Sequence, residues 1–314
     1  MSVIPSAESQ QSNPFLRSAN KERHRRERRV RLIFKGVTFL TLGISALLIL
    51  SLAGQAFQFL SHIDLSSLNS IGWFPRRGFY DIGTLIVGTA LVTGIAMVVA
   101  TPLGIGAAVY LSEFASPRMA KYLKPILEVL AGIPSVVVGY FALSFIGPDI
   151  VQSWFDTSQP QSLMAAGVGV GILIVPLIAS ICEDAFSAVP RELREASYGL
   201  GARSTATTLK VVIPAAFSGV VAALILAISR AFGETMVVAI AAGGSGGSLF
   251  TKSPLEQGQT LTGAVASVAS GTDAVAGASE AFNSLYFVSL VLFVITLALN
   301  ILGGRLVRSR REKY

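Results

Sequence analysis

The sequence predicts an all-α protein that crosses a lipid bilayer six times, and three observations support this fold class. Charged residues make up 14% of the 314 positions and hydrophobic residues 52%, whereas soluble domains carry about 25% charge. Six apolar segments each approach or exceed the roughly 20 helical residues that cross a hydrocarbon core. Basic residues cluster beside these segments. The predicted spans are residues 32–59, 82–111, 126–146, 164–182, 213–241 and 284–307.

The chain divides around these spans in a simple order. Residues 1–30 are polar, with little to bury, and we expect a largely disordered tail. Residues 31–81 hold the first span and an outer loop, and residues 82–307 hold a membrane domain of five helices. Residues 308–314 form a short basic tail. The apolar run at 32–59 exceeds the 7–15 residues typical of a signal peptide, so the first span is expected to be retained.

The basic residues predict the orientation of the spans. With the N-terminus in the cytoplasm, 21 of the 25 Lys and Arg residues fall on the inner side, and only Arg76, Arg77 and Lys252 fall on the outer side. The remaining basic residue, Arg230, falls inside the fifth span. Inner loops carry an excess of basic residues in membrane proteins. Both termini are therefore expected to be cytoplasmic.

Composition also excludes several classes of function. The single cysteine, Cys182, forms no intrachain disulfide, and the two histidines, His24 and His62, have no ligand-like neighbours. The basic clusters abut apolar segments and contain no interleaved aromatic residues, which argues against nucleic-acid binding. No Gly-x4-Gly-Lys-Ser/Thr motif occurs, so the chain should not hydrolyse ATP. No nucleophile–base constellation suggests an enzyme, and we expect no catalytic residue, metal site or cofactor in this chain.

A polar loop at about 183–212 separates the fourth and fifth spans. Pro190 can open a helix at its first turn, and Leu193, Ala196 and Leu200 recur at helical spacing as a small apolar ridge. Gly199 and Gly201 allow a turn before a second short helix from about residue 204. An amphipathic helix of this kind suits docking into the groove of a partner; an interfacial helix lying on the membrane is the alternative.

The fifth span contains two charges, Arg230 and Glu234, four residues apart and therefore on one face of a helix. A charge at this depth costs from about 2.5 to more than 10 kcal/mol, so the pair should face the bundle interior, a water-filled path or a partner. A guanidinium presents a planar fork that matches phosphate-type oxygens, and a carboxylate can accept a hydrogen bond from a protonated oxyanion. The pair therefore predicts an anion contact, with a static ion pair between helices as the alternative.

Two sequence motifs resemble those of a known transporter family. Glu195-Ala196-Ser197, followed by Gly201 and Pro214, resembles the EAA loop of bacterial ABC importer permeases. The segment from Arg230 to Met236, Arg-Ala-Phe-Gly-Glu-Thr-Met, resembles the signature of PstC, a permease family of bacterial phosphate importers, and residues 131–135 resemble that family's Ala-x-Ile-Pro-Ser segment. The sister family, PstA, usually continues after Gly-Glu-Thr with Ala-Pro, so Met236 favours PstC.

The resemblance implies a MetI-like fold, a substrate, a location and partners. It implies phosphate import across the bacterial plasma membrane beside a PstA-like permease, with two PstB-like ATPase subunits that bind ATP and Mg and a PstS-like phosphate-binding protein outside. The implied substrate-path residues are Arg230, Glu234, Ser135 and Thr235. The implied ATPase-coupling residues are Arg191, Glu192, Arg194, Glu195, Ala196, Ser197, Gly201 and Pro214. Alternatives are a permease for sulfate or molybdate, the PstA-type sister subunit, and a carrier that needs no ATPase.

Overall fold

The computed structural model describes residues 14–155, 159–244, 246–271 and 280–309, and the chain divides into two units after Gly54. In the first unit the described chain is the helix α2 (Pro14–His62), which continues past Gly54 into the second unit. Its apolar side chains, such as Phe39 and Leu50, are exposed. The stretch Glu27–His62 is long and apolar enough to cross a membrane.

The start of α2 differs from the sequence prediction. Helix begins at Pro14, so residues 14–30 are helical where a disordered tail was expected. Lys, Arg, Glu and Leu, which dominate this segment, lose little side-chain freedom in a helix and favour it. Residues 1–13 lie outside the described residues.

The second unit contains helices of very different lengths and a small sheet. Its long helices are α3 (Ile82–Val109), α4 (Pro117–Ala131), α7 (Leu163–Ser187), α11 (Phe217–Phe232) and α15 (Glu280–Ser309). Its shorter α-helices are α5 (Ser135–Phe141), α6 (Ser153–Phe155), α8 (Arg191–Gly199), α9 (Ser204–Thr207), α10 (Ile213–Ala215), α12 (Met236–Ala241) and α13 (Leu261–Ala269). Wider, π-helical turns are η3 (Tyr110–Phe114), η4 (Ala142–Gln152) and η5 (Thr208–Val212). Short 3₁₀ turns are η1 (Leu65–Asn69) and η2 (Pro75–Arg77).

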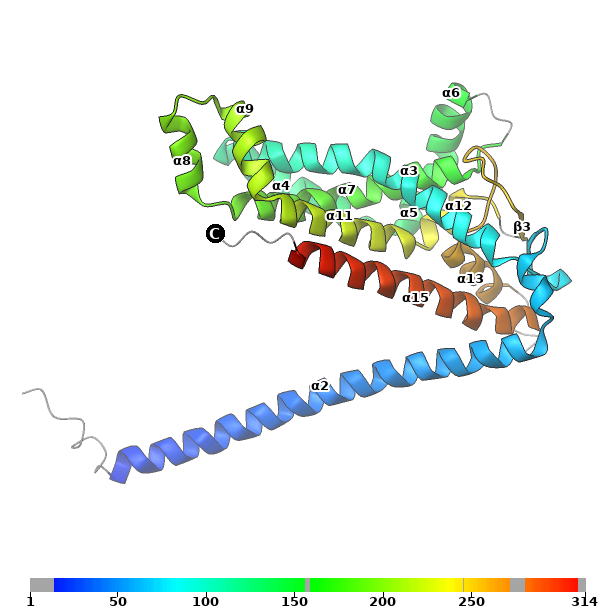
Figure 1. Cartoon of the computed structure of the whole chain (residues 1–314), viewed down its shortest axis with the longest axis horizontal. Coiled ribbons are helices and arrows are strands. Elements are labelled where there is room, and N and C mark those ends of the chain that lie inside the picture. The colour runs from blue at the N-terminus through cyan, green and yellow to red at the C-terminus, as the bar shows by residue number, and fades with distance from the viewer. Residues whose placement is uncertain (1–13, 156–158, 245, 272–279, 310–314) are drawn as a thin grey trace, which may run out of the picture. The chain divides into compact units, whose positions relative to one another are not determined.

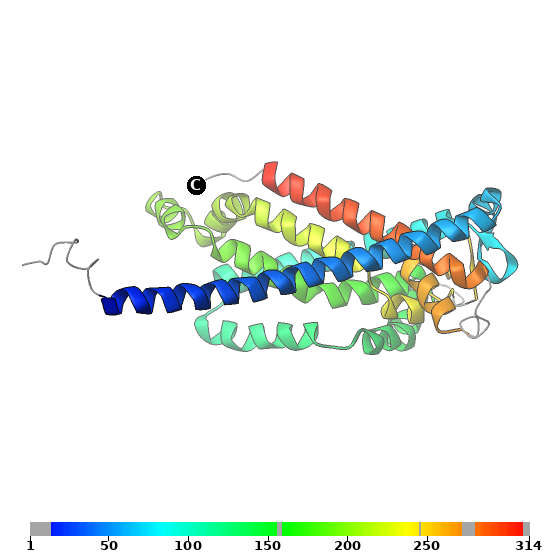
Figure 2. The same ribbon diagram turned by 90° about the horizontal axis from the view of Figure 1, so that it is seen from below.

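The centre of this unit is the packing of α3 against α7. A Cβ atom added to Gly104 would lie 2.7 Å from Cβ of Ile178, and one added to Gly167 would lie 2.7 Å from Cβ of Ile95. Small residues allow this close approach of two helix backbones, as is common between membrane helices. Helix α11 packs on α7 and on α15, and Figures 1 and 2 show α15 running alongside α11. Ser229 of α11 donates a hydrogen bond to Asn300 of α15 at 3.1 Å.

A second cluster of buried side chains lies at the end of the unit that carries the sheet. Strands β1 (Gly72–Phe74), β2 (Phe79–Tyr80) and β3 (Ser248–Leu249) pair antiparallel in the order β2-β1-β3. Trp73 packs edge-on against Tyr80, and Phe59 at the end of α2 packs against the same ring. The polar loop at residues 183–212, which contains α8 and α9, lies at the opposite end of the unit (Figure 1).

The described chain contains five helical stretches that are long and apolar enough to cross a membrane, or six if one bent pair is counted as a single span. The predicted third span, residues 126–146, is wrong in position, because the chain breaks between α4 and α5 and the span is Ser135–Phe155. Pro134 causes the break, since proline lacks an N–H and disfavours helix at the residue before it.

The predicted fifth span, residues 213–241, is not one continuous helix. The chain bends by 69° between Ser204–Ala215 and Phe217–Phe232, and these two segments together form the candidate span. Helix α11 then ends at Phe232, with Gly233 as its C-cap, and α12 begins at Met236. Glu234 therefore lies in a break between two helices and not within one.

Candidate functional site

Arg230, on the last turn of α11, and Glu234, in the break after that helix, lie close together. Nη2 of Arg230 lies 3.7 Å from Oε2 of Glu234, which is longer than the 2.7–2.9 Å of a charge-assisted hydrogen bond. The Glu234 side chain is only 4% exposed, whereas that of Arg230 is 59% exposed. The predicted charge pair is present, although the helix that was expected to carry both residues ends between them.

Backbone hydrogen bonds fix Glu234 in place. Its N–H donates to the carbonyl of Ala231 at 3.2 Å, and its own carbonyl accepts a hydrogen bond from Oγ1 of Thr262 on α13 at 2.7 Å. A buried carboxylate is costly unless an opposite charge accompanies it. Glu234 is therefore a fixed counter-charge, while the guanidinium of Arg230 beside it is mostly exposed and borders open space.

That open space is a cavity of about 560 Å³ bounded by α4, α5, α7 and α11. Arg230 and Ser135 both line it, together with Ser180 of α7. Its charged lining residues are Lys124, Glu128, Glu183, Asp184 and Arg230. We call this cavity the inner pocket, because its carboxylates lie near the end of α7 that leads to α8.

The four predicted substrate-path residues thus occupy different places. Arg230 and Ser135 share the inner pocket, whereas Glu234 and Thr235 are not among its lining residues. Oγ1 of Thr235 donates to the carbonyl of Gly233 at 3.2 Å and so closes the turn after α11. In this geometry an anion in the inner pocket does not contact Glu234 directly.

Sequence reasoning missed an ion pair at the wall of the inner pocket. Nζ of Lys124 on α4 lies 3.0 Å from Oε1 of Glu183 on α7, and Oγ of Ser187 donates to the same carboxylate oxygen at 3.2 Å. Lys124 entered the sequence analysis only as one of the inner basic residues. The available signal was a carboxylate, Glu183, directly after an apolar run.

The polar loop at residues 183–212, called the coupling loop after its predicted role, contains the two short helices expected from its sequence. Helix α8 begins after Pro190, and α9 begins at Ser204. Gly201 has a φ of +80°, a left-handed conformation that glycine adopts without strain. Oγ of Ser197 and Oγ1 of Thr207 lie 2.8 Å apart and join α8 to α9. The backbone conformation of Gly201 and the hydrogen bond between Ser197 and Thr207 therefore both stabilise the turn between the two helices.

The predicted coupling residues divide into an outward and an inward group. Arg191, Glu192, Glu195 and Ala196 are exposed, as is Pro214 at the far end of the loop. The predicted apolar ridge does not form one surface, because Leu193 packs against the core while Leu200 is 90% exposed.

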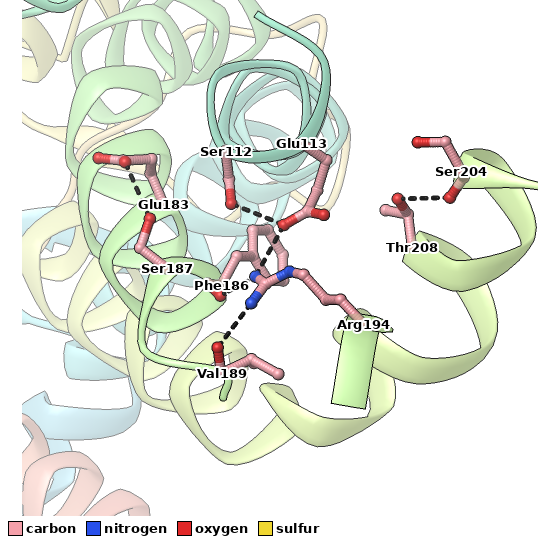
Figure 3. A network of polar contacts seen from close by, with 9 residues as sticks. All are labelled: Ser112, Glu113, Glu183, Phe186, Ser187, Val189, Arg194, Ser204 and Thr208. Carbon is pink, nitrogen blue, oxygen red and sulfur yellow. Dashed lines mark hydrogen bonds and ion pairs between the residues drawn. The ribbon is translucent and has the colours of Figure 1, made fainter. Parts of the chain in front are cut away.

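Arg194 is the coupling residue that turns inward, with its side chain 17% exposed. Its guanidinium donates to the carbonyls of Val189 at 2.6 Å and Phe186 at 2.8 Å, and pairs with Oε1 of Glu113 at 3.0 Å. Glu113 belongs to η3 at the end of α3 and also accepts a hydrogen bond from Ser112 at 2.9 Å. Figure 3 shows Arg194 reaching from α8 into this group. Glu113 was not predicted as a functional residue, because nothing in the sequence relates it to a residue 81 positions away.

In the described ranges, no group of three or more His, Cys, Asp or Glu side chains is placed to hold a metal ion. The polar groups of the inner pocket are two hydroxyls, two cations and three carboxylates. This set can bind and release a charged solute, and it contains no nucleophile paired with a base.

Comparison with known proteins agrees with this architecture. Residues 100–312 match the family described as the inner membrane component of binding-protein-dependent transport systems. The chain is 33% identical to the probable ABC transporter permease YqgH of Bacillus subtilis, over 99% of this chain and all of that protein. It is also 33% identical to the phosphate transport system permease PstC 1 of Mycobacterium bovis, over 74% of each chain.

A solved structure shows the same fold. The MetNI methionine ABC transporter in an inward-facing conformation matches 74% of this chain and 96% of its own, with a TM-score of 0.53 and 19% identity. Five helical stretches of the described chain, or six if the bent pair counts as one span, are long and apolar enough to cross a membrane, in keeping with an inner membrane component. The chain belongs to the family of inner membrane components of binding-protein-dependent transport systems, the permease subunits of ABC importers.

Proposed function

We propose that this chain is a PstC-type permease subunit of an ATP-driven phosphate importer. The observation that carries the proposal is the guanidinium of Arg230, which lines the inner pocket while its counter-charge, Glu234, stays buried beside it. The relative named as a phosphate transport system permease supports phosphate as the solute. Arg230 and Ser135 are the proposed contacts of the anion within this chain.

The geometry of the pair suits a solute that binds briefly. A separation of 3.7 Å leaves the guanidinium without a short hydrogen bond to Glu234, so its fork of N–H donors can turn toward phosphate oxygens. When no anion is present, Glu234 offsets part of the charge of Arg230. The cost of a cation at this depth in the membrane is thereby reduced.

The rest of the inner pocket favours release of an anion toward the cytosol. Apart from Arg230, the charged lining residues are Lys124 and the three carboxylates Glu128, Glu183 and Asp184, which together carry a formal charge of −2 when all are ionised (+1 − 3). Like charges repel, and low-dielectric walls strengthen the repulsion. Phosphate that passes Arg230 therefore enters a region that does not retain it.

Movement is supplied by other subunits in this proposal. The exposed face of α8, with Arg191, Glu192, Glu195 and Ala196, is the proposed docking surface for a PstB-like ATPase, two copies of which bind ATP and Mg. A PstA-like permease completes the path, and a PstS-like protein delivers phosphate to the outer loops. The distribution of basic residues supports both termini in the cytoplasm.

Uptake by a reconstituted complex tests the proposal. We expect Arg230→Gln to abolish uptake of labelled phosphate while the complex still assembles, because glutamine keeps hydrogen-bond donors but loses the charge. Arg118→Gln is the matched control, since Arg118 is an exposed basic residue of α4 outside the inner pocket. Excess sulfate or molybdate should leave wild-type uptake unchanged. Normal uptake by Arg230→Gln, or strong competition by the other oxyanions, would contradict the proposal.

A further inference from the structure

The partly buried side chain of Arg194 connects three segments of the chain. It leaves α8, bonds the carbonyl of Phe186 in the last turn of α7 and that of Val189 just after α7, and pairs with Glu113 in η3, directly after α3 (Figure 3). The other basic residues of the coupling loop, Arg191, Arg203 and Lys210, are exposed. Arg194 is thus built into the membrane domain, although it lies on the helix that is expected to face a partner.

The bonds to α7 exploit the end of a helix. The last four carbonyls of a helix lack partners within it and carry a partial negative charge. The guanidinium bonds one of these acceptors, the carbonyl of Phe186, and also the carbonyl of Val189 two residues past the end of α7, from a single planar group. Lysine, a single ammonium on a flexible stem, cannot reproduce a fork of this kind. Arg194 therefore ties α8 to α7 in one orientation.

The bond to α3 ends in a carboxylate with little access to water. The Glu113 side chain is 5% exposed and lies in the π-helical turn η3. Single π-helical turns of this sort occur often at functional positions. Removing one partner of a buried ion pair leaves an uncompensated charge, which is more damaging than the loss of a surface pair. The pairing of Glu113 with Arg194 is thus strongly favoured whenever this end of the molecule is folded.

The bend and the break of the chain in this region lie elsewhere. The chain bends by 69° between α10 and α11, and it breaks again between α11 and α12. Both points lie on the segment that carries Arg230. The walls of the inner pocket contributed by α7, including Ser180 and Glu183, lie on the segment that Arg194 clamps.

We propose that Arg194 and Glu113 form a rigid strut that makes α8 and the inner ends of α3 and α7 move as one body. This inference rests on the proposed function, in which an ATPase moves α8. The strut transmits that movement directly to α3 and α7. The bend before α11 allows α11, which carries Arg230, to move less than α7 does. The inner pocket then changes shape between α7 and α11 during each cycle. Arg194 is a positioning residue in this account and does not contact the solute.

Distance measurements between spin labels test the rigid body. Cysteines replace the exposed residues Tyr198 on α8 and Leu103 on α3 in a Cys182→Ser background, in the assembled complex. We expect the Tyr198–Leu103 distance to be the same in nucleotide-free and ATP-trapped complexes, whereas the distance from Tyr198 to a label at Leu226 of α11 changes. With Glu113→Ala, the Tyr198–Leu103 distribution should broaden. A wild-type Tyr198–Leu103 distance that changes as much as the Tyr198–Leu226 distance would overturn the proposal.

The coupling ratio supplies a second readout, namely phosphate moved per ATP hydrolysed by equal amounts of assembled complex. Glu113→Ala and Arg194→Lys should each lower this ratio by about tenfold, within the usual range of coupling between sites. The exposed control Arg118→Ala should leave it unchanged. An unchanged ratio in both strut variants would also overturn the proposal. The distance test stands whichever anion the complex carries, so it is independent of the assignment of phosphate.

Discussion

At the scale of single residues, the Arg230–Glu234 pair derives its properties from unequal burial. Glu234 is 4% exposed and held by Thr262 through its backbone, so it cannot follow a solute. Arg230 is 59% exposed and lies on the last turn of a helix, so its long side chain can move with a solute. The buried partner sets the charge balance and the exposed partner makes the contact.

Gly201 supports a prediction at the same scale. Its φ of +80° costs a residue with a Cβ about 1–2 kcal/mol, so Gly201→Ala should destabilise the turn between α8 and α9. We expect phosphate transport per ATP to fall in a reconstituted complex that otherwise assembles normally.

The matched control for this change is Gly199→Ala. Neither glycine would place a new Cβ within 4 Å of another atom, and only Gly201 has a positive φ. Equal coupling in the two variants would show that the backbone conformation of Gly201 does not matter for the loop.

At the scale of elements, the α3–α7 contact supports a second prediction. Gly104→Ala would place its Cβ 2.7 Å from Cβ and Cγ2 of Ile178, and overpacking of this kind typically costs about 1–3 kcal/mol. The melting temperature of the purified protein in detergent should therefore fall.

Gly106→Ala, two residues further along the same helix, meets nothing within 4 Å. It should leave the melting temperature unchanged or raise it, because alanine is favoured over glycine in a helix by about 0.5–1 kcal/mol. If both variants melted at the same temperature, the close approach of α3 and α7 would not be a source of stability.

The two misplaced spans share one physical cause. A hydropathy window counts residues that prefer lipid or core, and such residues dominate positions 126–146 and 213–241, so each stretch is predicted as a single span. The breaks at Pro134 and Gly233 come from backbone chemistry, which a hydropathy window does not measure. Pro134 was visible as an interruption, but membrane helices also tolerate proline. The position of a proline in the sequence therefore does not show whether the proline kinks a membrane helix or ends it.

At the scale of the whole molecule, the sequence was sufficient for the fold class and the family, and insufficient for the site. Hydropathy and the two motifs predicted an importer permease, which the family match and the solved relative confirm. The pairing of Arg230 with Glu234 was predictable because the two residues lie four positions apart. The pairs Arg194–Glu113 and Lys124–Glu183 were not, because they join residues 81 and 59 positions apart. Only the packing of α3, α4 and α7 brings them together.

The most direct test of the account asks whether phosphate occupies the space in front of Arg230. A cysteine at Ser135, in a Cys182→Ser background, would line the inner pocket and react with a small thiol reagent. We predict that phosphate slows this labelling in the assembled complex, that sulfate does not, and that Arg230→Gln removes the protection. Labelling at the same rate with and without phosphate in the complex that retains Arg230 would contradict the central claim.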